Sequence, residues 1–268
     1  MRYSSMPQLR SYLQPTSTLP AEFIKLNPSE SHHLIRVNRG RPGTRVSVFD
    51  GQGNEWQCQI VKPDPKETLL RIEEYTKTTS PVCEIVLAQA LPKGKTMDQI
   101  VRKATEIGVN HIVPLQTQQT QVHPKENQNK IEKWTLTAIE ACKQSGNSYL
   151  PEIKPIQTLE SWLAQYSSCD TGSLKLVASL ESKAVSLKQS IEQFHSPTKD
   201  LSREIICLIG PEGDFTPQEY NLISDQGFQP IRLAMHILRV ETAAIYALSI
   251  IDYERFLCEN SQRPLNDF

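Results

Sequence analysis

The sequence lacks the features of membrane-spanning and secreted chains. No stretch approaches the roughly 20 consecutive apolar residues that a membrane span needs, and the longest apolar run, near Val240 to Ile251, is interrupted by Glu241. The first 20 residues are polar and hold no apolar segment of a signal peptide. We therefore expect a cytoplasmic protein without a membrane partner.

The cysteines lack the close spacing of metal and redox motifs. The six cysteines are Cys58, Cys83, Cys142, Cys169, Cys207 and Cys258. No two lie within four residues of each other, and no histidine stands at a metal-ligand spacing from any of them. A chain of 268 residues without a signal sequence does not need a disulfide framework. We expect reduced, mostly buried thiols and no bound metal.

An excess of positive charge is also lacking. The 29 Lys and Arg residues are balanced by 30 Asp and Glu residues, so the overall charge does not point to a nucleic-acid partner. A local basic patch is nevertheless enough for RNA binding, because phosphates are contacted locally. Arg36, Arg39, Arg41 and Arg45 form such a stretch, with no acidic residue between them. We favour RNA-backbone docking for this stretch over a solvated loop.

Residues 21–75 read as short strands joined by turns. Val46–Phe49 ends at Asp50-Gly51, and an Asp-Gly pair after an alternating run predicts a hairpin. Further strands are expected at 56–61 and 68–75, which together predict a small antiparallel β-barrel. The polar segment 77–81 ends in proline and marks a domain boundary. We expect one domain at residues 1–76 and a second at residues 82–268.

The second domain alternates strands with helices. Strands are expected at 84–90, 111–115, 174–180, 204–209 and 229–233, and helices at 96–108, 125–146 and 240–258. This alternation predicts a parallel α/β sheet with helices on both faces. The helix at 240–258 is apolar nearly all round, so it must be covered in the fold or in a subunit interface. His32 and His33 in the first domain are expected to begin a short helix rather than to bind metal.

Two loops near the end of the chain predict a ligand site. A β-rich run to Ile209 leads into Gly210-Pro211-Glu212-Gly213, and Thr216 with Glu219 predicts a capped helix after it. Ligands of open α/β sheets bind at the carboxyl ends of strands, where glycine lets the backbone approach them. On spacing alone, an ordinary turn with two glycines explains this loop equally well. In the second loop, 233–244, Arg239 and Glu241 stand at a helix start, and alone they would suggest a surface ion pair.

Together these loops resemble those of the RsmE-type family of ribosomal RNA uridine N3-methyltransferases. The family pairs an Ile-Gly-Pro-Glu-Gly-Gly-Phe loop with a later Leu-Gly-x-x-Ile-Leu-Arg-x-Glu-Thr-Ala loop. Ile209–Gly213 with Phe215 matches the first, and 237–239 with 241–243 matches the second, at the family's spacing. The resemblance continues through 87–108 and 140–153, and the first domain resembles the family's RNA-binding barrel of PUA type.

The resemblance implies a fold, a cofactor, a substrate and an assembly. The fold is a SPOUT-type α/β domain with a trefoil knot in residues 82–268, preceded by the PUA-like barrel. The cofactor is S-adenosylmethionine, and the target is N3 of a specific uridine in 16S ribosomal RNA, within the small ribosomal subunit. The enzyme is expected to be a homodimer.

The resemblance and the charge pattern also assign residues. Catalytic roles fall to Arg239 and Glu241, although no residue stands out as a general base. The expected cofactor-binding residues are Ile209, Gly210, Pro211, Glu212, Gly213, Leu233, Ile237, Leu238, Arg239, Thr242 and Ala243. The expected RNA contacts are Arg36, Arg39, Arg41, Lys93 and Lys95, the last two in a Lys-Gly-Lys turn that a solvated loop would also explain.

The chain departs from the family pattern at five positions. Asp214 stands for a second glycine and Ala234 for the glycine after Leu233, while Gln119, Asn147 and Tyr149 stand where arginines are common. These changes leave open a SPOUT methyltransferase that acts on transfer RNA, or a non-catalytic RNA-binding homologue. A nucleotide-binding oxidoreductase is disfavoured, because no Gly-x-Gly-x-x-Gly follows an early strand.

Overall fold

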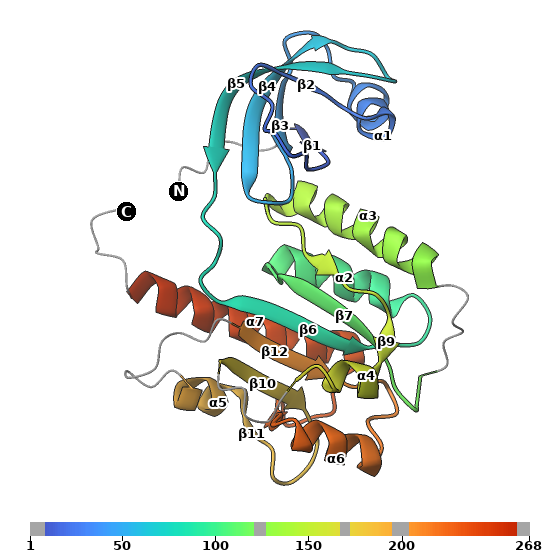
Figure 1. The fold of residues 1–268 in the computed structure, drawn as a ribbon, viewed down its shortest axis with the longest axis vertical. Helices are drawn as coiled ribbons and strands as arrows, with labels where there is room; N and C mark the ends of the chain where they lie inside the picture. Colours follow the sequence, from blue (N-terminus) through green and yellow to red (C-terminus); the bar gives the residue numbers. More distant parts are fainter. Residues whose placement is uncertain (1–8, 121–126, 167–171, 195–203, 262–268) are drawn as a thin grey trace. The chain divides into compact units, whose positions relative to one another are not determined.

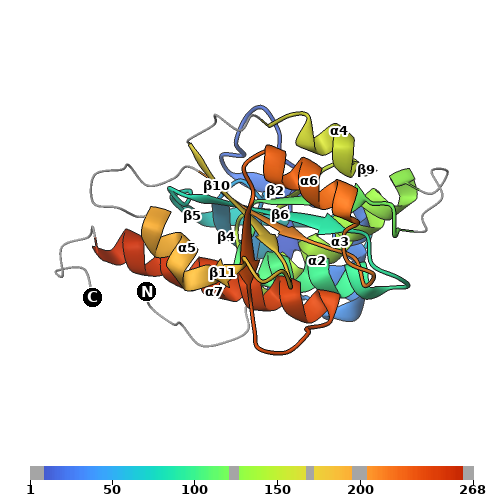
Figure 2. The same cartoon turned by 90° about the horizontal axis from the view of Figure 1, so that it is seen from below.

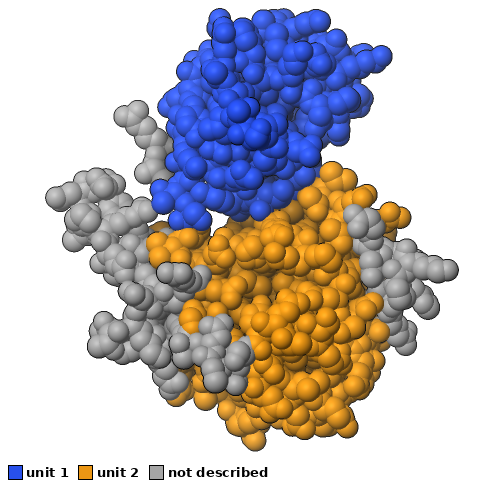
Figure 3. Space-filling model, in the orientation of Figure 1, with its two compact units in different colours: residues 1–80, 139–150, 268 blue, residues 81–138, 151–267 orange. Residues whose placement is uncertain are grey.

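A computed structural model describes residues 9–120, 127–166, 172–194 and 204–261. They form two compact units, coloured separately in Figure 3. Unit 1 takes its described residues from 1–80 and 139–150, and unit 2 from 81–138 and 151–267. Helix α3 (Asn127–Ser145) therefore contributes its last residues to unit 1. Within the described ranges, no helix is long and apolar enough to cross a membrane.

Unit 1 is built on a five-stranded sheet (Figure 1) with the order β1-β3-β4-β5-β2. The strands are β1 (Leu9–Tyr12), β2 (Phe23–Lys25), β3 (Arg45–Phe49), β4 (Asn54–Lys62) and β5 (Leu69–Lys77). The expected hairpin is present between β3 and β4, where the Asp50 carboxylate accepts hydrogen bonds from the backbone of Gln52 and Asn54. The apolar core of the unit consists of Ile24, Leu26, Leu34, Val46, Val48, Trp56, Cys58, Ile60 and Leu70.

Two expectations for unit 1 need correction. The strand β1 pairs with β3 in parallel, whereas an all-antiparallel sheet was expected. No tight turn joins these two strands, so local turn geometry does not set their relative direction. His32 ends a helix rather than beginning one, since α1 (Pro28–His32) begins at Pro28, where the Asn27 side chain caps the backbone N–H of Glu30. His33 does begin a short helix, the π-helical turn η1 (His33–Val37), as expected.

A partly buried ion pair holds unit 1 together. The Arg10 guanidinium lies 2.8 Å from the Glu55 carboxylate, which also accepts hydrogen bonds from Ser47 (2.6 Å) and Ser148 (2.7 Å). Arg10 also donates to the carbonyl oxygen of Cys142. Burial by itself would raise the pKa of Glu55, but the hydrogen bonds from Ser148, Ser47 and Arg10 outweigh burial and leave this pKa below its ordinary value. The network joins β1, β3 and β4 to the segment 139–150.

The lowered pKa of Glu55 predicts a pH-dependent contribution to stability. An acid with a depressed folded-state pKa stabilises the fold fully above its unfolded-state pKa, and that contribution is lost as the pH falls through the folded-state value. Glu55→Gln should therefore lower the free energy of unfolding by about 1.5–3 kcal/mol at neutral pH, and the difference from wild type should shrink below about pH 4. Urea denaturation at several pH values measures both effects. The exposed neighbour Glu74 supplies the control Glu74→Gln, and a difference for Glu55→Gln that stays constant with pH would contradict the prediction.

Unit 2 contains a parallel sheet of eight strands with the order β11-β13-β10-β12-β6-β7-β8, and β9 also pairs with β7. The strands are β6 (Glu84–Ala90), β7 (His111–Gln116), β8 (Glu152–Ile153), β9 (Gln157–Thr158), β10 (Ser173–Ala178), β11 (Val185–Ser186), β12 (Glu204–Ile209) and β13 (Gln229–Arg232). The five expected strands are thus confirmed, with ends that shift by two residues or fewer. The short strands β8, β9 and β11 were not expected.

Helices cover both faces of this sheet, as Figure 2 shows. On one face lie α2 (Thr96–Ile107), α5 (Leu187–Phe194) and α7 (Val240–Ser261), with α7 packed on β6 and β12 between the other two helices. The other face carries α4 (Leu159–Leu163) and α6 (Pro217–Asp225). Trp162, Ile223 and Phe228 pack there against alternate strand residues such as Val86 and Ile206. The expected α/β architecture is confirmed.

The helix α7 is covered on one face within unit 2 and exposed on another. Its buried apolar side chains are Val240, Ala244, Ala247, Leu248 and Ile251. Large apolar side chains remain exposed on the other face, among them Tyr246 (44%), Tyr253 (59%) and Phe256 (58%). The helix was expected to need cover on nearly all sides. Unit 2 covers only one of its faces, and apolar side chains on the other face stay exposed.

Candidate functional site

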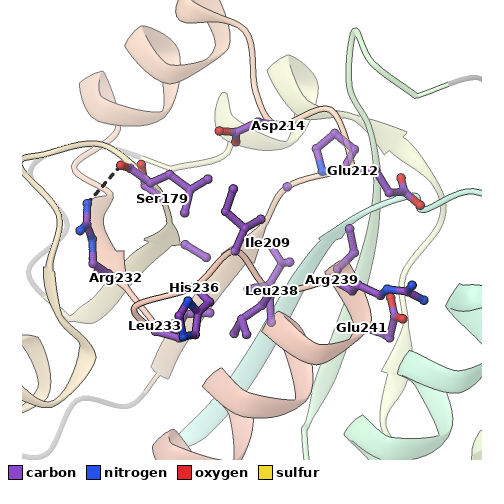
Figure 4. A pocket seen from close by; sticks show the side chains of 18 of the residues that line it. Ser179, Ile209, Glu212, Asp214, Arg232, Leu233, His236, Leu238, Arg239 and Glu241 are labelled. Carbon is purple, nitrogen blue, oxygen red and sulfur yellow. Dashed lines mark hydrogen bonds between the residues drawn. The ribbon is translucent and has the colours of Figure 1, made fainter.

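The parallel register brings three strand ends together. Ala178 of β10 pairs with Ile231 of β13, and Val177 pairs with Leu208 of β12. The segments that follow these three strands line one cavity of about 520 Å³ (Figure 4). The two loops in which a shared site was expected, Gly210–Gly213 and 233–244, contribute most of the lining. This location agrees with the general rule that ligands bind at the carboxyl ends of parallel strands.

Most of the expected cofactor-binding residues line this cavity, together with the two expected catalytic residues. The expected residues found in the lining are Ile209, Gly210, Pro211, Glu212, Leu233, Ile237, Leu238, Arg239, Glu241 and Ala243. Two expected residues lie outside it. A Cβ on Gly213 would lie 3.4 Å from Cβ of Gln119, so this glycine faces the segment after β7. Thr242 borders a second depression on α7 with Tyr246, because successive helix residues point in directions about 100° apart.

Sequence reasoning missed nine residues of the lining. They are Thr96, Ala178, Ser179, Leu180, Asp214, Arg232, Ala234, His236 and Val240. The segment 174–180 was expected to be a strand, so the rule that ligands sit at strand ends could have found 178–180. The Arg232 guanidinium donates hydrogen bonds to the carbonyl oxygens of Leu180 (3.2 Å) and Glu181 (3.3 Å), and so fastens the segment after β10 to the end of β13.

A buried carboxylate positions the first loop. Glu219 is 0% exposed and completes the expected capping box at the start of α6, since it accepts a hydrogen bond from the backbone N–H of Thr216 (2.8 Å). Its other oxygen accepts from the backbone N–H of Gln118 (2.9 Å), which follows β7. The same side chain therefore holds the loop between β12 and α6 and the segment beside Gly213.

The first loop is tightly folded around Gly210. A Cβ on this residue would lie 3.1 Å from Cε2 of Phe215, a distance that few real Cβ atoms show. Asp214 has a φ of 62°, in the left-handed region. Its carboxylate accepts hydrogen bonds from the backbone N–H of Phe215 (2.8 Å) and the hydroxyl of Tyr220 (2.9 Å). Burial, together with Asp214, raises the pKa of Tyr220 and keeps this hydroxyl a donor.

The second loop ends at the start of α7. The carbonyl oxygen of Arg239 accepts the hydrogen bond from the N–H of Ala243, so Arg239 stands at the helix N-terminus. Glu241 lies in the first turn, where the helix dipole favours an acid. Figure 4 shows both side chains at one end of the cavity. Within the described ranges the exposed Arg239 guanidinium has no hydrogen bond or ion pair, so its charge is available to a ligand.

Comparison with known proteins agrees with this arrangement. A model of the RNA methyltransferase domain matches residues 78–252, and a model of the RNA methyltransferase PUA domain matches residues 26–73. The ribosomal RNA small subunit methyltransferase E of Synechocystis sp. is 33% identical over 233 residues, which cover 85% of this chain and 72% of that protein. The chain belongs to the ribosomal RNA small subunit methyltransferase E family.

Further relatives and solved structures are similar to this chain along most of their length. The Bacillus subtilis member is 27% identical over 247 residues, which cover 90% of this chain and 94% of that protein. A Legionella pneumophila structure, described as a methyltransferase with bound S-adenosylmethionine, has a TM-score of 0.80 at 28% identity and covers 93% of this chain and 98% of that one. The Neisseria gonorrhoeae methyltransferase E, solved with S-adenosylmethionine, has a TM-score of 0.79 at 26% identity, with coverages of 92% and 98%.

The departures from the family pattern have structural explanations. Asp214 adopts the left-handed backbone that favours glycine, and Asp is one of the few L-residues that tolerate it. Ala234 needs no such conformation, since Arg39 and Asp214 alone have positive φ among the described non-glycine residues. In unit 1 the Asn147 side chain accepts from the backbone N–H of Tyr149, whose hydroxyl donates to the carbonyl oxygen of Thr78 (2.6 Å). These two side chains therefore bond within unit 1.

The residues expected to contact RNA are exposed in both units. Arg36, Arg39 and Arg41 are exposed in unit 1, whereas Arg45 lies 3.7 Å from Glu73. Lys93 and Lys95 are exposed in the turn between β6 and α2, and Thr96 directly after them lines the cavity. The lysine turn therefore lies at the margin of the cavity.

Removal of the Glu219 carboxylate should destabilise the site and the fold together. Glu219→Ala leaves the backbone N–H groups of Thr216 and Gln118 without their acceptor, and we expect the free energy of unfolding to fall by about 2–4 kcal/mol. The amide hydrogens of the loop between β12 and α6 and of the segment after β7 should also exchange faster. Chemical denaturation and hydrogen exchange measure these effects. The exposed neighbour Gln218 gives the control Gln218→Ala, and equal stability of the two variants would refute the role of Glu219.

Proposed function

We propose that this protein transfers a methyl group from S-adenosylmethionine to N3 of a specific uridine in 16S ribosomal RNA. The observation that carries the proposal is the single cavity formed by the loops 209–214 and 232–243 at the carboxyl ends of β12 and β13. Relatives named ribosomal RNA small subunit methyltransferase E support the substrate, and two similar structures with bound S-adenosylmethionine support the cofactor. A ribosomal substrate also supports a cytoplasmic location.

The cavity fits this cofactor in size and chemistry. Its volume of about 520 Å³ lies in the range of roughly 300–1,000 Å³ of small-molecule sites. Apolar side chains of Ile209, Leu233 and Leu238 can enclose a flat ring, and Gly210 lets the backbone approach closely. We assign binding of the cofactor to the backbone of 210–212 and 233–238. When bound, S-adenosylmethionine supplies a methyl group activated on a positively charged sulfur.

Arg239 and Glu241 are assigned to the RNA end of the reaction. N3 of uridine carries a proton and pairs within helices, so the base must be unpaired or flipped and must lose that proton. The resulting negative charge spreads to the uracil oxygens, where a positioned guanidinium stabilises it. Arg239 lies in the cavity lining, where the described residues give its guanidinium no hydrogen bond or ion pair, and Glu241 stands in the first turn of the helix that begins at Arg239.

Arg239→Ala should lower turnover more than it lowers cofactor affinity. We expect kcat to fall by about 10²–10³-fold, as when one oxyanion-stabilising donor is removed, while the Kd for S-adenosylmethionine changes much less. Methylation kinetics and calorimetry measure the two quantities. Unchanged turnover at unchanged cofactor affinity would remove Arg239 from the mechanism.

The substrate assignment has a direct test. Mass spectrometry of 16S ribosomal RNA from a deletion strain should show the loss of one methylated uridine, and the purified protein should restore it on small ribosomal subunits. Methylation of transfer RNA instead would favour a different target for the same chemistry. Absence of S-adenosylmethionine binding by calorimetry would favour a non-catalytic RNA-binding protein.

The fold and the domain roles are part of the same proposal. We assign RNA docking to a PUA-like barrel at residues 1–76, with Arg36, Arg39 and Arg41 as phosphate contacts, and catalysis to residues 82–268, with Lys93 and Lys95 at the cavity margin. We also propose that the second domain has the SPOUT trefoil knot. In the sheet, β12 lies between β10 and β6, and α7 packs on β6 and β12. This arrangement supports the proposed topology.

A homodimer is proposed from the exposed face of α7. Tyr246, Tyr253 and Phe256 remain exposed there, and Glu241 borders both the cavity and the depression beside Tyr246. A two-fold axis through this face would cover the apolar side chains with those of a second copy.

Tyr253→Glu should convert the dimer to monomers, because it places a charge in a buried apolar contact. Light scattering at micromolar concentration measures the mass. The control is Leu136→Glu, at a similarly exposed residue (64%) of α3, which should leave the dimer intact. A wild-type monomer under these conditions would contradict the proposed assembly.

A further inference from the structure

A hydrogen bond joins the lysine turn to the glycine loop. The backbone N–H of Lys93 donates to Oε1 of Glu212 at 2.9 Å, across 119 residues of sequence. Gly94 has a φ of 66°, and nothing lies within 4 Å of the position of a Cβ on it. No side chain or backbone therefore packs against this face of Gly94 in the described residues, and the Glu212 carboxylate gives the turn a hydrogen-bond partner in unit 2.

The turn presents two lysine side chains. Within the described ranges, neither Lys93 nor Lys95 has an ion pair, and both side chains are exposed. Asp98, the acid in the first turn of α2, is occupied by the ammonium group of Lys133 and the indole N–H of Trp134. The ammonium groups of the turn therefore remain available to phosphate.

Glu212 connects the cavity with the lysine turn, because the residue lines the cavity and its carboxylate accepts the hydrogen bond from Lys93. It lines the cavity between Pro211 and Asp214, but Figure 4 shows its side chain directed away from Ile209 and Leu238. A ligand that binds the backbone of 210–212 restrains this residue. The hydrogen bond to Lys93 then transmits that restraint to the lysine turn.

We propose that Glu212 is a positioning residue that couples cofactor binding to RNA phosphate binding by Lys93 and Lys95. This inference rests on the proposed function. The cofactor holds the glycine loop, the loop holds the turn through Glu212, and the ordered turn binds RNA with less loss of conformational freedom. Since coupling between two sites is reciprocal, bound RNA also strengthens cofactor binding by the same factor.

The coupling can be measured by binding alone. The affinity of the wild-type protein for small ribosomal subunits from a deletion strain should rise by roughly 5–10-fold when S-adenosylhomocysteine is saturating. Glu212→Ala should abolish most of this gain and raise the KM for the subunits more than it lowers kcat. Glu212→Gln keeps an acceptor for the Lys93 N–H and should restore the gain. Persistence of the gain in Glu212→Ala, or failure of Glu212→Gln to restore it, would overturn the proposal.

A double-mutant cycle separates the turn from other effects of Glu212. In a background with Lys93→Gln and Lys95→Gln, the further change Glu212→Ala should no longer alter the KM for the subunits, because the charges that it positions are gone. In the control background Lys188→Gln, on α5, the effect of Glu212→Ala should persist in full. Equal effects of Glu212→Ala in both backgrounds would contradict the proposal. A wild-type protein that binds neither ligand fails the proposed function itself, whereas one that methylates RNA without coupling overturns this inference alone.

Discussion

The candidate site depends on the buried carboxylate of Glu219. Its two oxygens accept backbone N–H groups from Thr216 and Gln118, on two different segments. A buried acceptor with two fixed donors has little freedom, because the loss of either bond leaves a polar group unsatisfied. The loop from Gly210 to Thr216 is consequently held at both ends, by β12 and by the capped start of α6. Within this loop a Cβ on Gly210 would lie 3.1 Å from Cε2 of Phe215.

The sheet order decides which segments share the cavity. β10 lies between β13 and β12, so the loops after β12 and β13 are separated by one strand rather than adjacent. The residues at the end of β10, Ala178 to Leu180, therefore line the cavity between them. Local sequence patterns predicted each of these strands correctly but contain no information on their order. The rule that ligands sit at strand ends could have suggested Ser179 and its neighbours, but the position of their strand between the two loops was not visible in the sequence.

Features with a strong local cause were predictable from the sequence. α2 ends before Gly108, whose φ of 98° lies in the left-handed region. The capping box of Thr216 and Glu219 starts α6 as expected. The two-residue strands β8, β9 and β11 were missed, because they are too short to show periodicity and form by pairing with distant strands. The parallel pairing of β1 with β3 has the same origin. Thr242 lies outside the cavity lining, and a linear motif does not show which helix residues face a cavity.

The replaced arginines bear on how the protein recognises RNA. Asn147 and Tyr149 form hydrogen bonds within unit 1, and Gln119 packs beside Gly213, so these positions serve the fold here. The proposed phosphate contacts are therefore the other exposed cations, Arg36, Arg39, Arg41, Lys93 and Lys95. Lys93 and Lys95 stand at the margin of the cavity through the bond from Lys93 to Glu212. In the proposed reaction only a positioned charge would help to hold a uridine in line with a methyl donor, and this bond gives the proposed lysine contacts a defined position.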